Sequence, residues 1–442
     1  MSTIVEQSNP PATPRYILRG HASAIHALHF FAGNTRLISA DAEGWIVVWD
    51  VTTKRPRAVW KAHEGAVLEV KGYMCSGQGM EIFTHGRDHK LRVWRIKSSA
   101  DELLLNRILP VERNQVNDSS RREVLPAEPW LVHSLPVNAL NFCAFSLCYF
   151  REAVAARAPE VDPGDSSRSE SVENALSVYF AVPNALNSGA IDIFHLPSEK
   201  RVSTIAADTS IQTGMVMAVN ILLTTQNQLY VLSGYEDGQV MVHIRRSITD
   251  MSTLWKWERI YVSRPHSQPV LSLDSVNFAA DKSFFLTSSA DSLIVKHPIS
   301  SVDSLGPTAA VVETTPLKVL NTKHSGQQGL RVREDQKIFA TAGWDSRIRV
   351  YSCKTMKELA VLKWHKEGCY AVAFAEVLSS LSNFYASNES NTAHNASADT
   401  QVALSNESPL QIIQSQRSQK AQQMHWLAAG SKDGKISLWD IY

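Results

Sequence analysis

The sequence predicts an all-β protein, a seven-bladed β-propeller whose last blade is closed by a strand from the N-terminus. Three observations lead to this fold class. A short sequence pattern occurs seven times, and about forty residues separate most of its copies, enough for four short strands. The last copy is followed by too little chain for a fourth strand, whereas an unassigned strand precedes the first copy.

The pattern is a Ser or Thr, an acidic residue four positions later, and an apolar run that ends in an aromatic residue or His after six more. Asp-Gly and Asp-Ser favour turns, and the residues that follow alternate as a strand does. In Asp433–Trp439, Ile436 and Leu438 point to one face while Lys435 and Ser437 point to the other. The copies are Ser39/Glu43/Trp49, Thr84/Asp88/Trp94, Ser233/Asp237/His243, Thr287/Asp291/His297, Thr341/Asp345/Tyr351, Ala429/Asp433/Trp439 and a degenerate one at Ser188–Phe194.

A His precedes most of these turns, and this combination resembles the WD40 repeat. In WD40 proteins the His bonds the turn Asp, while the Ser or Thr and the Trp complete a buried network that specifies blade geometry. The predicted network residues are His21, Ser39, Trp49, His63, Thr84, Asp88, Trp94, Ser233, Asp237, His266, Thr287, Asp291, His324, Thr341, Asp345, His365, Asp433 and Trp439.

The repeats predict one propeller domain over residues 15–442, after a disordered N-terminus of residues 1–14. Arg15–Leu18 is expected to form the fourth strand of the last blade, which removes open sheet edges. Polar insertions are expected at about 98–129, 157–173 and 379–423. In the third of these, 24 of 45 residues are Ser, Thr, Asn or Gln, which predicts a loop that does not order itself. It is either a tolerated surface insertion or a tether that folds on a partner.

Composition excludes several function classes. A net charge of +1 gives no reason to expect nucleic-acid or membrane binding, and no apolar run reaches the length of a membrane span, so we expect a soluble intracellular protein. Five scattered cysteines lack zinc-site spacing and are expected to be reduced. The cluster His85, Asp88 and His89 falls on a repeat turn, and no catalytic or nucleotide-binding motif is present. We therefore expect no catalytic, metal or cofactor site and no small-molecule substrate.

A propeller without catalytic residues is typically a binding platform, with function on the loops of a rigid scaffold. Four residues at or just before the predicted turns are candidates for a partner-facing rim, because Trp, Tyr and Arg favour interaction hot spots. These candidates are Trp45, Arg87, Tyr235 and Trp344. Packing inside the blade is the alternative role for each of them.

Particular phrases resemble the fungal ASTRA-associated WD-repeat family over almost the whole chain. The most specific are Thr84–Asp88 and Leu135–Cys143, and weaker ones are Leu18–His21, Leu37–Asp50, Trp60–His63 and Leu427–Asp440. The resemblance implies a non-enzymatic nuclear subunit of the ASTRA assembly, linked to chromatin remodelling. It also implies work beside a chaperone adaptor that matures phosphatidylinositol-3-kinase-related kinases.

Three functions follow as expectations. The first is a scaffold subunit of an ASTRA-type complex, with its other subunits and the chaperone adaptor as partners, in the nucleus or also in the cytoplasm. The second is a different WD40 adaptor, such as a G-protein-β-like signalling scaffold or a ubiquitin-ligase substrate receptor. The third is a propeller enzyme, which the missing catalytic motifs make the weakest of the three.

Overall fold

The computed structural model describes residues 12–75, 79–113, 127–138, 142–151, 176–225, 227–246, 255–275, 283–300, 312–378 and 409–441. It confirms the predicted fold class, an all-β β-propeller of seven four-stranded antiparallel blades. The chain divides into two compact units, of which the first combines residues 1–134 with 327–442 and the second spans 135–326.

The first unit contains four blades. Across each sheet their strand orders are β2-β3-β4-β5, β6-β7-β8-β9, β22-β23-β24-β25 and β1-β28-β27-β26. The strands are β1 (Tyr16–Arg19), β2 (Ile25–Phe31), β3 (Arg36–Asp41), β4 (Trp45–Asp50), β5 (Arg55–Lys61), β6 (Val67–Cys75), β7 (Gly79–Gly86), β8 (Lys90–Ile96), β9 (Trp130–Pro136), β22 (Gln327–Val332), β23 (Ile338–Gly343), β24 (Arg347–Ser352), β25 (Glu358–Lys363), β26 (Cys369–Phe374), β27 (Trp426–Ser431) and β28 (Lys435–Asp440).

The second unit contains three blades, each formed by four strands that are consecutive in the sequence. Their strands are β10 (Ser146–Arg151), β11 (Leu176–Pro183), β12 (Ile191–Leu196), β13 (Lys200–Ile205), β14 (Val216–Leu223), β15 (Leu229–Tyr235), β16 (Val240–Arg246), β17 (Lys256–Ser263), β18 (Val270–Ser275), β19 (Phe284–Ser289), β20 (Leu293–Pro298) and β21 (Lys318–Asn321).

Each blade buries both of its faces, which explains the strongly apolar inner strands. In β28, Ile436 and Leu438 join a cluster with Leu18 and Trp49, whereas Trp439 joins a second cluster on the other face. Burying one such aliphatic side chain stabilises the fold by about 1.5–3 kcal/mol. A blade alone would leave both clusters open to water, so its stability depends on the neighbours that stack against it.

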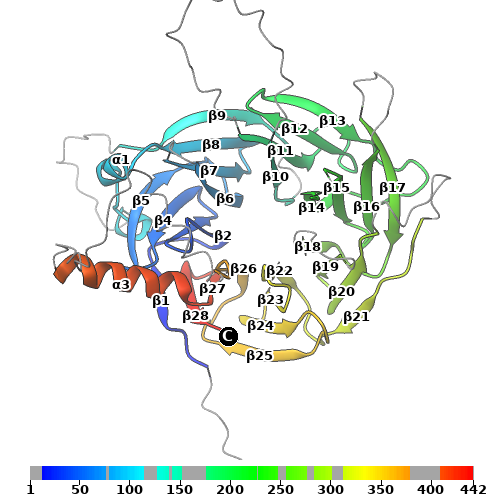
Figure 1. Cartoon of the computed structure of the whole chain (residues 1–442). Coiled ribbons are helices and arrows are strands. Elements are labelled where there is room, and N and C mark those ends of the chain that lie inside the picture. Colours follow the sequence, from blue (N-terminus) through cyan, green and yellow to red (C-terminus); the bar gives the residue numbers. More distant parts are fainter. Residues whose placement is uncertain are drawn as a thin grey trace, which may run out of the picture. The chain divides into compact units, whose positions relative to one another are not determined.

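The last blade is completed by the N-terminal strand, as predicted. Strand β1 pairs antiparallel with β28, with Tyr16 opposite Leu438 and Arg19 opposite Lys435 (Figure 1). The backbone N–H of Arg15 adds a 2.8 Å hydrogen bond to the carbonyl of Leu438. The strand is Tyr16–Arg19, one residue later than expected. Residues 1–11 of the predicted disordered terminus lie outside the described residues.

A partly buried ion pair connects the inner strands of the first unit. Arg331 on β22 places a guanidinium nitrogen 2.5 Å from a carboxylate oxygen of Glu69 on β6. Strands β26 and β2 lie between these two, because β22 packs on β26, β26 on β2, and β2 on β6. The pair therefore joins two blades that are not neighbours.

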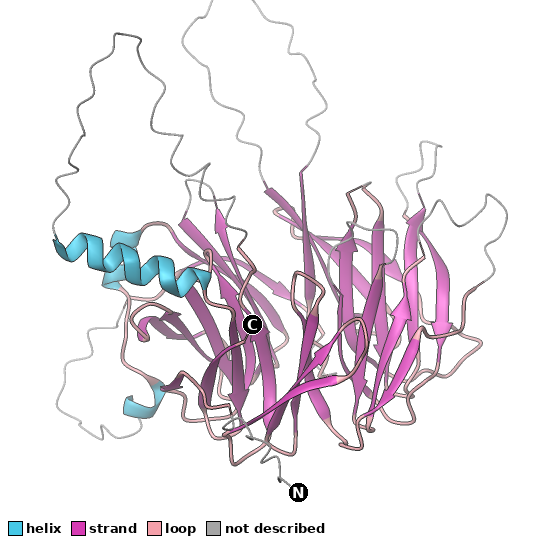
Figure 2. Cartoon of the chain, turned by 60° about the horizontal axis from the view of Figure 1, so that its bottom comes forward, coloured by secondary structure: helices cyan, strands magenta, loops and turns pink. Residues whose placement is uncertain are grey.

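Three helices occur in the described chain, all of them in the polar insertions of the first unit (Figure 2). They are α1 (Ser99–Leu104), α2 (Pro110–Arg113) and α3 (Pro409–Gln423). The expectation of a plain loop over 379–423 is wrong for its last third. The end of α3 is anchored, because Ala421 is buried and Asn34 donates a 3.0 Å hydrogen bond to the carbonyl of Gln422. The insertion 157–173 and residues 379–408 lie outside the described residues.

Deleting residues 1–19 is predicted to destabilise the propeller, whereas deleting residues 1–10 leaves it unchanged. The longer deletion removes β1, opens the edge of β28 and uncovers the cluster that contains Leu438. We expect a loss of several kcal/mol from a total of about 5–15. Thermal unfolding of the two truncations measures the difference, and equal melting temperatures would disprove the role given to β1.

Candidate functional site

Several predicted site residues lie in or beside the turns between the second and third strands. Two glycines show how these turns pack against the next blade. Gly44 and Gly434 both have a positive φ, +90° and +72°. A Cβ on Gly44 would lie 1.8 Å from the carbonyl oxygen of His63, and one on Gly434 would lie 2.4 Å from that of His21. Each turn therefore rests directly on the His segment of the next blade, and only glycine permits this approach.

The β6–β9 blade contains the complete predicted network. His63 Nδ1 donates to Asp88 at 2.8 Å, and its Nε2 lies 2.8 Å from the Thr84 hydroxyl, which also accepts from Trp94 Nε1 at 3.1 Å. Arg92 pairs with the outer oxygen of Asp88 at 2.7 Å. Burial would raise the pKa of Asp88, but the hydrogen bonds from His63 and Arg92 lower it well below its usual value.

The β2–β5 blade builds the same network with a different acid. His21 Nδ1 donates to Asp41 at 2.8 Å, while its Nε2 and the indole N–H of Trp49 both meet the Ser39 hydroxyl. Glu43, which the repeat pattern places at the acid position, is exposed, and its backbone N–H donates to Asp41. The pattern thus misplaces the acid by two residues, because Asp41 ends β3 and is the carboxylate that reaches inward.

In the last blade it is the hydroxyl group, and not the acid, that comes from a different position of the repeat. Its repeat has Ala429 at the Ser or Thr position, and Ser437 on β28 takes over this role. The Ser437 hydroxyl lies 2.8 Å from His365 Nε2 and 2.8 Å from Trp439 Nε1. His365 Nδ1 is 3.9 Å from Asp433, beyond hydrogen-bond distance. Burial lowers the pKa of His365 to about 4, although the Asp433 charge acts in the opposite direction.

In the β18–β21 blade the network continues from the hydroxyl through a second His ring to a Tyr hydroxyl. His266 Nδ1 lies 3.2 Å from both oxygens of Asp291, and its Nε2 is 2.9 Å from the Thr287 hydroxyl. That hydroxyl meets His297 Nε2 at 2.9 Å, and His297 Nδ1 meets the Tyr261 hydroxyl at 2.9 Å. His297 therefore replaces the Trp of other repeats, and burial keeps its pKa well below the ordinary value.

Two blades depart further from the prediction. His324 is exposed, so its assignment to a buried network is wrong; the buried Gln327 accepts from the Thr341 hydroxyl at 2.7 Å instead. Asp345 is paired with Arg349 through two hydrogen bonds. In the β14–β17 blade, the Ser233 hydroxyl lies 3.2 Å from that of Tyr235, while Asp237 accepts from the backbone N–H of Gln239.

The four rim candidates occupy different environments. Arg87 and Trp344 are exposed, and the Trp344 indole donates to Gln328 at 2.6 Å. Trp45 is half-buried under the guanidinium of Arg113, which α2 places 4.8 Å from the ring. Tyr235 is only 3% exposed, so the expectation that it lies on a rim is wrong and its alternative role, packing inside the blade, applies.

Sequence reasoning missed a second set of surface residues at β-bulges. The first strand of each blade in the first unit shifts register at its second residue, and these residues are His26, Leu68, Gln328 and Tyr370. A bulge releases one residue from the ladder and redirects its side chain. All four are flanked by buried residues and are themselves half-exposed. For His26 and Tyr370 the sequence signal is a polar or aromatic residue directly after the first apolar residue of the strand, whereas Leu68 and Gln328 carry no such signal.

The bulge and turn residues lie close together on the first unit. The rings of His26 and Tyr370 meet edge to face with centroids 5.9 Å apart. A Cβ on Gly368 would touch both the Tyr370 ring, at 3.2 Å, and the Trp344 backbone. Burial lowers the pKa of His26, Asp41 partly offsets this, and the charge of Arg87 lowers it further. We call Trp344, Gln328, Tyr370, His26 and Arg87 the turn-face strip.

Within the described ranges, no group of three or more His, Cys, Asp or Glu side chains is arranged to hold a metal ion. The helices described are too short or too polar to cross a bilayer. The chemistry that the described surface offers is aromatic stacking, hydrogen bonding and cation–π contact, which are the interactions of protein recognition.

Replacing Asp41 by Ala is predicted to lower the free energy of unfolding by about 1–3 kcal/mol, because His21 and two backbone N–H groups lose their acceptor. Glu43→Ala is the matched control, and its effect is expected to stay within about 0.5 kcal/mol since this side chain is exposed. Chemical denaturation compares the two. A larger loss for Glu43→Ala would restore the acid position given by the repeat pattern.

Stability is predicted to fall as the pH drops from about 6.5 toward 4. The unfolded His365 takes up a proton near pH 6.5, whereas the folded one resists protonation down to about 4. His365 therefore contributes its full stabilisation above pH 6.5 and loses up to about 3 kcal/mol below it. In His365→Gln, melting temperature should depend less steeply on pH over this window. The exposed His324→Gln serves as control, and a slope that neither variant changes would contradict the prediction.

Comparison with known proteins places the chain in a family. Residues 14–439 match the family model described as ASTRA-associated protein 1. The chain is 54% identical to the ASTRA-associated protein 1 of Penicillium rubens over 459 residues, which cover 100% of both proteins. It is 55% identical to that of Aspergillus niger, covering 98% of each, and 33% identical to that of Schizosaccharomyces pombe, covering 82% of this chain and 93% of the relative. The chain therefore belongs to the ASTRA-associated protein 1 family.

Proposed function

We propose that this chain is a non-catalytic scaffold subunit of an ASTRA-type nuclear complex. The complex is linked to chromatin remodelling and to the maturation of phosphatidylinositol-3-kinase-related kinases. The chain contacts its partner subunits and a kinase-maturation chaperone adaptor directly through propeller surfaces. The single observation that carries the proposal is the family match over residues 14–439, whose relatives bear the name ASTRA-associated.

The buried polar groups support a structural role for the repeat residues rather than a chemical one. The His, Asp and hydroxyl groups of the β6–β9 blade bond one another, and Trp94 closes the set from inside. A catalytic His or Asp needs a free lone pair or proton directed at a substrate. In this blade both ring nitrogens of His63 already have protein partners, so the side chain fixes the turn and does not meet a ligand.

The turn-face strip supports protein recognition. It presents Trp, Tyr and Arg side chains on turns and bulges that the buried networks hold in place. Such residues dominate interface energies, since their rings and guanidinium groups bury large areas at low entropic cost. A rigid scaffold keeps the strip ordered before binding, which reduces the entropy lost on association.

Truncating the strip is predicted to weaken complex assembly without unfolding the protein. Trp344→Ala and Tyr370→Ala should each reduce recovery of ASTRA subunits about tenfold or more, because loss of a hot-spot residue costs about 2 kcal/mol. The control is Trp130→Ala, which removes another exposed tryptophan, on β9, with a 70% exposed side chain. Affinity purification from native cells with quantitative mass spectrometry measures recovery.

The same purification tests the proposed function itself. Recovery of ASTRA subunits with the unmodified chain is the expected result. Recovery of G-protein-type effectors or ubiquitin-ligase subunits in their place would favour a different adaptor role and overturn the proposal. If Trp130→Ala reduced ASTRA recovery and the strip variants did not, membership of the complex would still be supported. The contact surface would then be the outer strand β9 and not the turn-face strip.

A further inference from the structure

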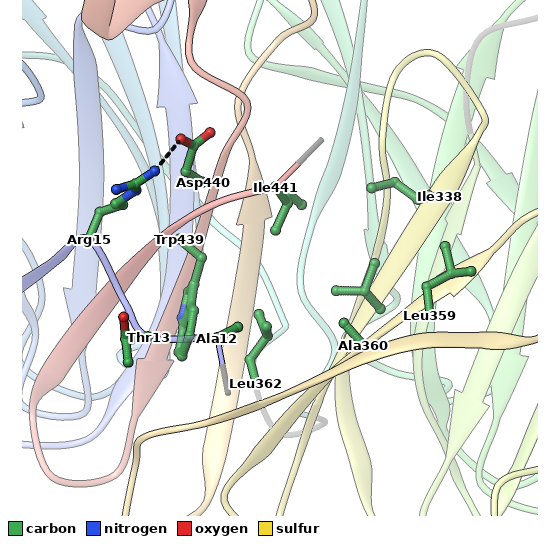
Figure 3. Close-up of a pocket in the computed structure, with 11 residues that line it drawn as sticks. Ala12, Thr13, Arg15, Ile338, Leu359, Ala360, Leu362, Trp439, Asp440 and Ile441 are labelled. Carbon is green, nitrogen blue, oxygen red and sulfur yellow. Dashed lines mark hydrogen bonds and ion pairs between the residues drawn. The ribbon is translucent and has the colours of Figure 1, made fainter. Parts of the chain in front are cut away.

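An apolar cavity lies between the β22–β25 blade and the last blade of the first unit. Its volume is about 250 Å³. Figure 3 shows Trp439 and Ile441 facing Leu362, Ala360 and Ile338, with Ala12 and Thr13 beside the Trp439 ring. Leu359, at 48% exposed, stands at its mouth on β25. The cavity thus borders the outer edge of β25, which is the fourth strand of its blade.

We call the contact zone between two adjacent blades a seam. At another seam of the first unit, the corresponding place is filled by the chain itself. Beside the β2–β5 blade, the N–H of Val59 on β5 donates to the carbonyl of Asn106 at 2.8 Å, and the Asn106 amide donates back to Val59 at 3.0 Å. The adjacent Leu105 is buried in a cluster with Trp60 and Trp94. An extended segment therefore pairs with the strand edge and inserts an aliphatic side chain into the seam.

The second unit repeats this arrangement at one of its two seams. Beside the β14–β17 blade, the N–H of Val262 on β17 donates to the carbonyl of Glu313 at 2.9 Å, and the N–H of Glu313 donates to Ile260 at 3.0 Å. Val59 and Val262 hold the same position, two residues after the bulged residue of their own strand. The equivalent residue on β25 is Val361. No other segment in the described part of the chain pairs with this edge of β25.

Topology explains why no segment of this kind from the chain itself lies at this seam. Asn106 lies between β8 and β9, and Glu313 lies between β20 and β21, so both segments come from the link between the third and fourth strands of the following blade. In the last blade those two strands are β28 and β1, which are far apart in the sequence and have no such link. Side-chain size differs as well. Leu362 on β25 pairs with Ile348, and Trp60 on β5 pairs with Ile46 in the same register. The seam therefore has a Leu where the β2–β5 blade has the larger Trp.

We propose that the cavity and the edge of β25 bind an extended segment of a partner protein. A backbone carbonyl of that segment accepts from the Val361 N–H, as Asn106 does from Val59. One branched aliphatic side chain, Leu or Ile, enters the cavity against Trp439 and Leu362, as Leu105 does beside Trp60. This is strand addition with one anchoring pocket. The inference rests on the proposed function, because it requires that the chain act as a subunit of a complex.

A photo-crosslinking residue at position 359 tests the proposal in living cells before lysis. Benzoylphenylalanine replacing Leu359 should label one segment of an ASTRA subunit, identified by mass spectrometry, that contains a Leu or Ile. Attachment to residues 1–11 of the same chain, to a differently tagged second copy, or to nothing above background would overturn the inference. An affinity tag on the same protein reports complex assembly separately, so a missing crosslink in an intact complex rejects this surface and leaves the proposed function standing.

Two further variants, each carrying the same crosslinker, test the two halves of the site. Leu362→Trp fills the cavity with the side chain that β5 has at this position, and it should reduce the crosslink at least tenfold. Val361→Pro removes the edge N–H without removing a bond of the ladder, and it should reduce the crosslink to a similar degree. Val361→Ala, which keeps the N–H, is the control and should retain the crosslink. Undiminished labelling in both Leu362→Trp and Val361→Pro would disprove binding in the cavity.

Discussion

The pairing of β1 with β28 joins residues more than 400 positions apart, with Tyr16 opposite Leu438. The last blade has four strands because of this ladder, and its inner cluster is closed because Leu18 packs with Leu438 and Ile436. Local sequence forces cannot supply such a contact, since loop closure costs entropy before the pairing compensates for it. The same pairing places Ala12 and Thr13 at the cavity beside Trp439, so the closure of the blade also shapes the proposed binding seam.

The buried networks satisfy one physical requirement with several sets of residues. A hydroxyl between a His and an indole N–H occurs as Thr84 on β7, as Ser39 on β3 and as Ser437 on β28. In the β18–β21 blade, His297 serves in place of the indole. A buried polar atom without a partner costs free energy, so what each blade must preserve is the donor and acceptor pattern, whatever residue supplies it.

The two candidate surfaces arise where a strand ladder is interrupted or left open. Bulges release His26 and Tyr370 from the ladder, so that their rings meet, and Tyr370 lies close to the Trp344 turn. At the seam, the edge of β25 stays unpaired in the described chain, while the edges of β5 and β17 are covered by Asn106 and Glu313. Both features leave recognition groups on a scaffold that is held together mainly by the buried clusters and networks of the blades.

The sequence alone determined the fold class and the number of blades, because both rest on a local pattern repeated at regular spacing. It also predicted the N-terminal closure, since one strand precedes the first repeat and the last repeat lacks its fourth. It also identified the complete network around His63. Tertiary structure decided which acid reaches His21, that His324 faces solvent, and that Tyr235 is buried, since these depend on side-chain direction within a packed blade. It alone revealed the helix α3 and the seam cavity, because anchoring Ala421 and facing Leu362 toward Trp439 require strands from distant parts of the chain to meet.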